Sequence, residues 1–289
     1  MASRKFNYKS LARGLLSIAL FLILWEIGSR SKQWLGADIF SPVREALGGL
    51  GFKKTYLPWV GAVPAPTEVL HAWMGVITDA GYWHSWYKSS FRVAAGFLAA
   101  MLIGIPFGLL LAVNRTAYGV GFPVFEILRP IPPLAWVPAS IIFWPTQEMS
   151  IAFVTFLGAF YTIVINVVGG ARSIDGRYFQ AAESMGSSRA DIFRRIILPG
   201  TLPSIVVGSA VGMGITWEVV VAAEMISGGG SQVGGTGGGG LGFFIWNSYV
   251  GGSYEQIVVG MISIGIAGFI SSELLRSLGK YVTPWLRLR

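Results

Sequence analysis

Long apolar segments alternate with shorter polar segments along this chain. A helix that crosses a bilayer needs about 20 mostly apolar residues, and six segments are candidates for such helices. They cover approximately residues 14–27, 89–113, 119–144, 149–168, 202–226 and 255–275. The pattern therefore predicts an all-α, polytopic membrane protein with about six transmembrane helices.

The first and third apolar segments differ from the others. Residues 14–27 follow four basic residues, as in a secretory signal peptide, but no small-x-small cleavage site comes after them. We therefore expect a retained helix. Residues 119–144 contain prolines, each of which removes a backbone donor and crowds the preceding helical turn. Those in the middle of the segment are Pro130, Pro132, Pro133 and Pro138. The third span is therefore predicted to be broken in its middle.

Residues 30–88 show no spanning pattern, because prolines and charges are scattered through them. Within them, Thr67–Thr78 is mildly amphipathic and predicts an interfacial helix capped by Thr67. We divide the chain into residues 1–88, an N-terminal span plus an interfacial or extracytoplasmic segment, and a core domain formed by residues 89–289.

The composition excludes several classes of protein. Hydrophobic residues make up 53% of the 289, charged residues only 12%, and the mean hydropathy is +0.60. This charged share is about half that of a soluble domain, which argues against a soluble enzyme and against disorder. The chain has no cysteine, so disulfides, thiolate zinc sites and cysteine nucleophiles are excluded. With only His71 and His84 available, no metal site or Ser–His–Asp catalysis is expected.

The formal net charge is +8, and the placement of the basic residues predicts the orientation in the membrane. With a cytoplasmic N-terminus, the inside segments hold 14 Lys and Arg, whereas the outside loops at 145–148 and 227–254 hold none. The outside segment 30–88 holds six and goes against the rule, but long translocated segments follow it weakly. The inside segments are residues 1–13, 114–118, 169–201 and 276–289. We therefore expect both termini in the cytoplasm, and we read the charge as a topology signal rather than as nucleic-acid binding.

A glycine-rich stretch, residues 228–242, reads GGGSQVGGTGGGGLG. A loop that cradles phosphate needs a following Lys-Ser/Thr to reach the phosphates, and none is present. We predict a flexible outside loop.

The longest predicted inside loop, residues 169–201, carries the strongest functional signal. Helix-forming residues lie on both sides of Gly186, and glycine permits the positive φ of a turn. Ser188 is expected to cap the second helix, with Asp191 as its reciprocal partner, and Pro199 is expected to end it. Two short helices joined in this way suit docking to a soluble partner.

This loop resembles the EAA loop of ATP-binding-cassette (ABC) importer permeases, whose pattern is E-A-A-x3-G-x9-I-x-L-P. The matching positions are Gln180, Ala181, Ala182, Gly186, Ile196, Leu198 and Pro199, with glutamine in place of the first glutamate. The resemblance implies that these residues, with Glu183, form a cytoplasmic coupling helix. Such a helix lies in a cleft of the ATPase subunit and transmits its closure as a rigid-body movement.

Other motifs are similar to those of nitrate, bicarbonate, sulfonate and taurine permeases. They include Val63-Pro64-Ala65-Pro66-Thr67, Ser89-x-x-Arg92-Val93 and the proline-rich run that starts at Arg129. Ala222-Ala223-Glu224-Met225 looks most like the nitrate and nitrite permeases. The resemblance implies a nitrate or nitrite importer, with bicarbonate as the alternative and sulfonate or taurine third. A passive channel would need no coupling loop, and an enzyme would need a catalytic cluster.

Charges inside the spans are candidates for the translocation path, because they are costly at bilayer depth. Arg129 either pairs with Glu126 three residues away or offers positive charge to an anion beside the broken helix. Glu218 and Glu224 would repel an anion, so the alternatives for them are to anchor packing, to set a gate or to pair with Arg129 or Arg92. Trp136 and Trp217 either line the path or pack between helices. The path candidates are Arg92, Arg129, Trp136, Trp217, Glu218 and Glu224.

The chain has no G-x-x-x-x-G-K-[ST] motif, so it is expected to bind no ATP in that way and to carry no cofactor. The resemblance implies ATP and Mg on two partner ATPase subunits, a second permease copy and an extracytoplasmic substrate-binding protein. It also implies a bacterial inner membrane as the location.

Overall fold

The computed structural model describes residues 8–34, 63–228 and 239–285. Across these ranges the ordered elements are helices and no strand occurs, which confirms the predicted all-α fold. The chain divides into two compact units. One contains residues 1–79 and 248–259, and the other contains residues 80–247 and 260–289.

In the smaller unit, α1 (Tyr8–Trp34) is joined to α3 (Pro66–Val76) by a polar contact. Thr67 donates to Glu26 from its hydroxyl at 2.9 Å and from its backbone at 3.2 Å. The expectation that Thr67 caps this helix is wrong, because the N-cap is Ala65. Pro66 occupies the first helical position, where its missing N–H costs nothing.

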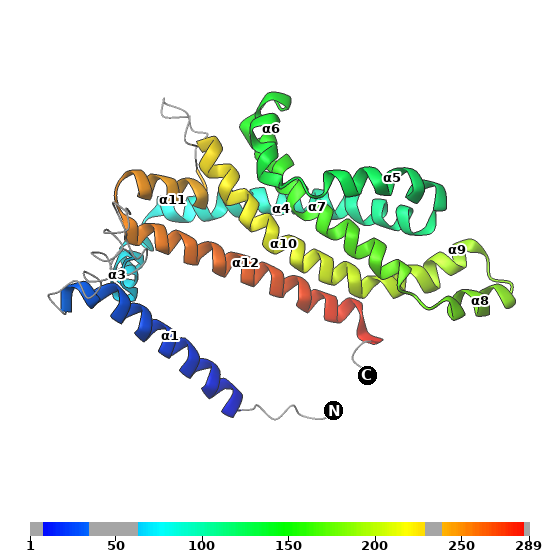
Figure 1. Ribbon diagram of the computed structural model, residues 1–289, viewed down its shortest axis with the longest axis horizontal. Coiled ribbons are helices and arrows are strands. Elements are labelled where there is room, and N and C mark those ends of the chain that lie inside the picture. The colour runs from blue at the N-terminus through cyan, green and yellow to red at the C-terminus, as the bar shows by residue number, and fades with distance from the viewer. Residues whose placement is uncertain (1–7, 35–62, 229–238, 286–289) are drawn as a thin grey trace, which may run out of the picture. The chain divides into compact units, whose positions relative to one another are not determined.

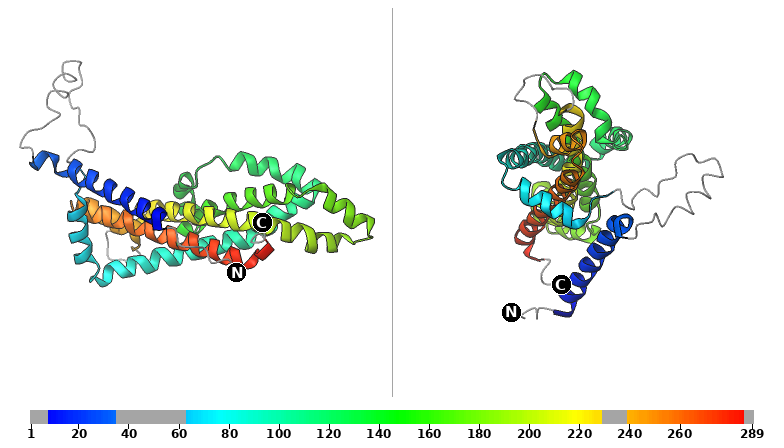
Figure 2. Two further views of the ribbon diagram at one scale, coloured as in Figure 1. Left: turned by 90° about the horizontal axis from the view of Figure 1, so that it is seen from below. Right: turned by 90° about the vertical axis from the view of Figure 1, so that its left-hand side faces the viewer.

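The larger unit is built on α4 (Ala80–Val113), α7 (Gln147–Arg172) and α10 (Leu198–Gly228). These helices lie side by side in Figures 1 and 2, and α7 packs against both of the others. Small residues allow the close approach: a side chain at Gly108 would come within 2.8 Å of Val167. Packing through small residues is how helices associate in a bilayer, where burial of apolar surface supplies little drive.

Five helices in the described ranges are long and apolar enough to cross a membrane. They are Ala12–Arg30 of α1, Ala80–Val113, Gln147–Arg172, Arg189–Ile226 and Tyr254–Val282, the last of which is α12. They correspond to five of the six predicted spans. The main difference is that α4 begins nine residues before the expected start at Ser89, in an aromatic-rich stretch.

The third predicted span is broken, as its prolines require. It consists of α5 (Arg115–Leu128), a 3-10 turn η1 (Pro133–Trp136) and α6 (Val137–Phe143). The chain leaves helical conformation between α5 and η1, where proline nitrogens have no proton to donate. Side chains of α5 complete an apolar core with α4 and α7. Its buried members are Leu111, Phe125, Leu157, Tyr161, Val164 and Val168.

Two further helical segments complete the larger unit. The residues of α12 from 260 onward pack on α10: the Trp217 indole N–H donates to Ser271 Oγ at 3.0 Å. The helix α11 (Leu241–Val250) begins where the glycine-rich stretch ends. Its start lies beside α4 and α10, because Leu241 N donates to Ser89 and Gly242 N donates to Glu224.

Candidate functional site

The coupling loop contains the predicted turn at Gly186. The helix α8 (Gly176–Ser184) ends with two backbone bonds, Ser187 N to Ala182 O at 3.0 Å and Gly186 N to Glu183 O at 2.9 Å. These are the two bonds of a Schellman motif, which needs a left-handed residue between helix and turn. Gly186 supplies it with φ 73°, so the prediction for this glycine is confirmed.

Asp175 caps the other end of α8. Its carboxylate accepts from the Arg177 backbone N–H at 2.9 Å and from the Arg177 guanidinium at 2.9 and 2.5 Å. The hydrogen bonds from the guanidinium, and then that from the backbone, hold the pKa of Asp175 below its ordinary value. The cap therefore stabilises α8 above the ordinary aspartate pKa and is lost as the pH falls through the lowered value.

The second helix of the loop is continuous with a membrane span. Ser188 caps α9 (Arg189–Ile192) by accepting from Asp191 N at 3.2 Å, and its hydroxyl donates to the Asp191 carboxylate at 2.5 Å. A wide π-helical turn, η2 (Phe193–Ile197), follows and runs directly into α10.

The expectation that Pro199 ends this helix is wrong. Leu198 N donates to Phe193 O across the wide turn, and α10 proceeds through Pro199 without a break. A wide turn just before a proline relieves the clash between the proline ring and the carbonyl four residues earlier. It also accommodates the backbone N–H that proline lacks. The coupling segment and α10 therefore form one helical unit.

The residues that match the coupling pattern differ in exposure. Gln180, Ala181, Glu183 and Gly186 are exposed, Ala182 is buried, and Ile196, Leu198 and Pro199 are half-buried. Two apolar side chains on the same loop were not expected as site residues: Tyr178 is 61% exposed and Met185 is 78% exposed. Their only signal in the sequence is an apolar residue in an otherwise polar loop.

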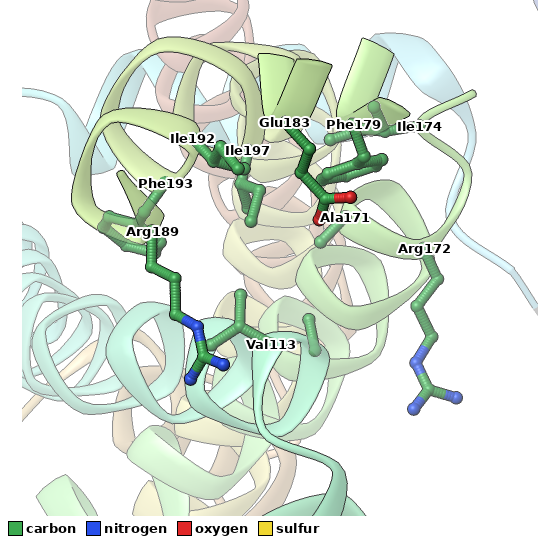
Figure 3. Close-up of a pocket in the computed structure, with 11 residues that line it drawn as sticks. Val113, Ala171, Arg172, Ile174, Phe179, Glu183, Arg189, Ile192, Phe193 and Ile197 are labelled. Carbon is green, nitrogen blue, oxygen red and sulfur yellow. The ribbon is translucent and has the colours of Figure 1, made fainter. Parts of the chain in front are cut away.

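A cavity of about 530 Å³ separates the coupling loop from the ends of α4 and α7. Its lining is mostly apolar, with three charged residues. The residues that form it are Ala112, Val113, Ala171, Arg172, Ile174, Phe179, Glu183, Arg189, Ile192, Phe193 and Ile197. Figure 3 shows Arg189 extending from α9 toward Val113, and Glu183 pointing into the space between the helices. The loop is thus continuous with α10 through helix and joined to α7 through residues 173–175, and the cavity lies between it and the ends of α4 and α7.

A second group of functional interest is the polar cluster, which we define as Ser89, Arg92, Glu148 and Glu224. Arg92 donates from Nε and Nη2 to the two Glu148 oxygens at 2.7 and 2.5 Å. Its Nη1 donates to Glu224 Oε1 at 2.8 Å. The Ser89 hydroxyl lies 2.8 Å from both oxygens of Glu224. The cluster therefore links α4, α7 and α10.

The same cluster holds the end of the glycine-rich stretch. Leu241 N donates to Ser89 Oγ at 2.8 Å, Gly242 N donates to Glu224 Oε2 at 2.9 Å, and Arg92 Nη1 also donates to the Gly239 carbonyl. Gly240 has φ 127°, and a Cβ there would lie 2.3 Å from the Glu224 carboxyl carbon. Glu224 therefore caps the start of α11. The flexible loop predicted for 228–242 lies largely outside the described residues.

The pairing left open for Glu224 is now decided, since it binds Arg92 and not Arg129. Arg129 Nη1 lies 3.3 Å from Glu126 Oε1, so that local pair exists. Among the expected path residues, only Arg92 and Glu224 come together. Glu148, the other carboxylate that binds Arg92, was not expected as a site residue. Its signal in the sequence is an acidic residue beside the start of a predicted span.

The remaining path candidates lie apart from the polar cluster. Trp217 is buried and hydrogen-bonded to Ser271, which agrees with the packing interpretation. Trp136 is half-buried against the apolar core of α4, α5 and α7. Glu218 is exposed on α10 and makes no hydrogen bond or ion pair with the described residues.

These features, a helical loop that continues into one of several apolar spans, are those expected of a membrane subunit of a transporter. Residues 104–288 match the family of binding-protein-dependent transport system inner membrane components. The chain belongs to this family, the permease subunits of ABC importers, and it is a multi-pass membrane protein.

Individual relatives carry several substrate names. The chain is 32% identical to a putative ABC transporter permease of Methanocaldococcus jannaschii, over 99% of this chain and 96% of that protein. It is 33% identical to the nitrate import permease NrtB of Synechocystis, over 94% and 89%. It is 31% identical to the taurine permease TauC of Escherichia coli, over 77% and 80%. A bicarbonate permease, CmpB of Synechococcus elongatus, is 32% identical over 71% and 70%.

The fold is also that of a solved transporter. An inward-facing structure of the MetNI methionine ABC transporter superposes with a TM-score of 0.55 and 22% sequence identity. The alignment covers 73% of this chain and 98% of that chain. At this identity the likeness shows the shared fold.

Proposed function

We propose that this chain forms the translocation path of an ATP-driven importer for nitrate or nitrite. The observation that carries the mechanism is the continuity between the coupling loop and α10, because it lets a force on the loop move a span. Two ATPase subunits, which hold the ATP and Mg, would bind the exposed surface around Gln180 and Met185. Their closure would then move the loop and α10 as one rigid body, and the cavity beside the loop gives it room to move relative to the ends of α4 and α7.

The exposed face of α10 supports a second permease copy as a partner. Val207, Val211, Gly214 and Glu218 lie three or four residues apart and are all exposed, so they share one face. A carboxylate near the middle of a span costs about 3 kcal/mol when it faces lipid. Glu218 lies eight residues before Ile226, about 12 Å from that end of the span. This face therefore belongs against a second copy and the path between the two.

The substrate proposal rests on similarity. One relative named for nitrate import matches over 94% of the chain, and bicarbonate, a planar oxyanion like nitrate, is the first alternative. An extracytoplasmic binding protein would deliver the anion to the outer face. In the bacterial inner membrane, the orientation expected from the basic residues places both termini in the cytoplasm and the polar cluster near the outer ends of α4 and α7.

Glu218 favours taurine as a second candidate. A carboxylate on the face that lines the path repels a bare inorganic anion but attracts the ammonium group of a zwitterion. Taurine carries both a sulfonate and an ammonium group, so it answers this charge as nitrate does not.

Uptake of labelled substrate tests the proposal. Cells with and without the chain are given labelled nitrate, with excess bicarbonate or taurine as competitors. We expect chain-dependent nitrate uptake that taurine does not block. Chain-dependent uptake of taurine alone would reject nitrate and assign the path to zwitterionic sulfonates.

A further inference from the structure

The two edges of the Arg92 guanidinium carry carboxylates of very different exposure. On the Nη1 side lies Glu224, whose side chain is 1% exposed and is also bound by Ser89 and by Gly242 N. On the Nε and Nη2 edge lies Glu148, whose side chain is 56% exposed, whereas that of Arg92 is 4% exposed. The guanidinium is therefore built into the protein through Glu224, and solvent reaches the carboxylate on its other edge.

That second edge has the geometry that a planar oxyanion requires. Two parallel N–H donors bind the two oxygens of Glu148 at 2.7 and 2.5 Å. Nitrate and bicarbonate present the same pair of oxygens as a carboxylate, and a guanidinium edge binds such groups in this bidentate way. Lys88, one helical turn before Arg92 on α4, interacts electrostatically with Glu148 and adds positive charge to the place.

We propose that the Nε and Nη2 edge of Arg92 is a binding site for a planar oxyanion, which Glu148 occupies in the absence of substrate. The inference rests on the proposed function and on its orientation. An arriving anion displaces the Glu148 carboxylate, which swings into solvent, where its charge is hydrated. Glu224 stays in place and keeps Arg92 aligned throughout, so the exchange leaves the start of α11 intact.

The alternative is that Glu148 is a clamp that only ties α7 to α4. The two roles differ in what Glu148→Gln does. Glutamine keeps the shape and one oxygen but removes the negative charge, so it competes less with an anion for the same donors. An exchangeable carboxylate therefore predicts tighter anion binding in this variant, whereas a clamp predicts lower stability with no gain in affinity.

The test uses the complete transporter, purified in nanodiscs without the binding protein. Binding of ¹⁵N-nitrate is measured from the line width of its NMR signal during titration. We expect Glu148→Gln to bind nitrate about fivefold more tightly, a gain of about 1 kcal/mol. Arg92→Lys, which offers a point charge in place of a planar edge, should lose the binding. Glu273→Gln, which removes the carboxylate of the exposed ion pair with Arg276, is the matched control and should bind as the wild type does.

A Glu148→Gln complex that is folded and hydrolyses ATP but binds nitrate no more tightly would overturn the inference. The proposed function fails separately, in a different measurement. If vesicles that contain the wild-type transporter and its binding protein take up neither nitrate nor bicarbonate, the substrate class itself is wrong, and the oxyanion site is rejected with it.

Discussion

At the scale of single residues, the left-handed backbone of Gly186 is the most constrained feature of the coupling loop. Gly186 lies between α8 and the turn to α9, and its φ of 73° is a left-handed conformation that β-branched residues rarely adopt. No atom lies within 4 Å of a Cβ built there, so the constraint comes from the backbone and not from space.

Gly186→Val should uncouple ATP hydrolysis from transport while the chain still inserts into the membrane. The cost of a β-branched residue in the left-handed region is about 1–2 kcal/mol, enough to shift the turn without unfolding the spans. Transport and ATPase rates of the reconstituted complex measure it. Gly186→Asn is the control, because asparagine tolerates this conformation and should retain most of the transport. If the valine variant couples ATP hydrolysis to transport as well as the asparagine variant does, coupling does not depend on the left-handed conformation at Gly186.

Glu218 gives a second prediction at the residue scale. Glu218→Gln removes one negative charge from the exposed face of α10, so uptake of a bare anion such as nitrate should rise, whereas uptake of a zwitterion such as taurine should fall. Initial uptake rates of labelled nitrate and labelled taurine, measured at several salt concentrations, show which of the two changes occurs. An unchanged rate for every transported solute would show that Glu218 does not face the path. Glu273→Gln again serves as control, because its carboxylate pairs with Arg276, outside the path candidates.

At the scale of elements, the wide turn between α9 and α10 is the finding with most consequence. Arg194 and Arg195 lie on this turn and are exposed, so their side chains add little to packing. The turn transmits force only as long as its backbone remains helical.

Replacing Arg194 and Arg195 together by glycine should weaken coupling while the ATPase subunits still bind. Each glycine costs about 1 kcal/mol of helix stability relative to alanine, so the link becomes flexible. The double alanine variant removes the same charges but keeps the helix and should couple normally. The number of ATP molecules hydrolysed per solute transported is the measurement. If the two variants behave alike, the charges matter and the continuity does not.

At the scale of the whole molecule, the absence of cysteine from the sequence gives a clean test of assembly. Gly214→Cys places a single thiol on the exposed face of α10, and Leu102→Cys places one on an exposed face of α4. If α10 lines the path between two copies, a bifunctional thiol reagent should crosslink the first variant into a dimer and leave the second monomeric on a denaturing gel. Crosslinking through Leu102 alone would move the interface to α4.

The larger features of this protein follow from its amino-acid sequence because they depend on local pattern. Apolar length determined the spans, and the prolines after Arg129 determined the break in the third. The spacing from Gln180 to Pro199 pointed to the coupling loop, since Gly186 and Ser188 act through bonds to residues at most five positions away. In the backbone of this loop, the continuation of helix through Pro199 was missed, because it depends on a widened turn that no residue type specifies.

The tertiary structure alone decided which distant charges meet. Arg92 binds Glu148 and Glu224, which lie 56 and 132 positions away in sequence. Both pairs depend on how α4, α7 and α10 pack. The same packing buried Trp217, left Glu218 exposed and placed the end of the glycine-rich stretch on Glu224. Sequence spacing carries no information about such contacts, because a charge in a span needs only some partner, and the arrangement of the helices determines which one it finds.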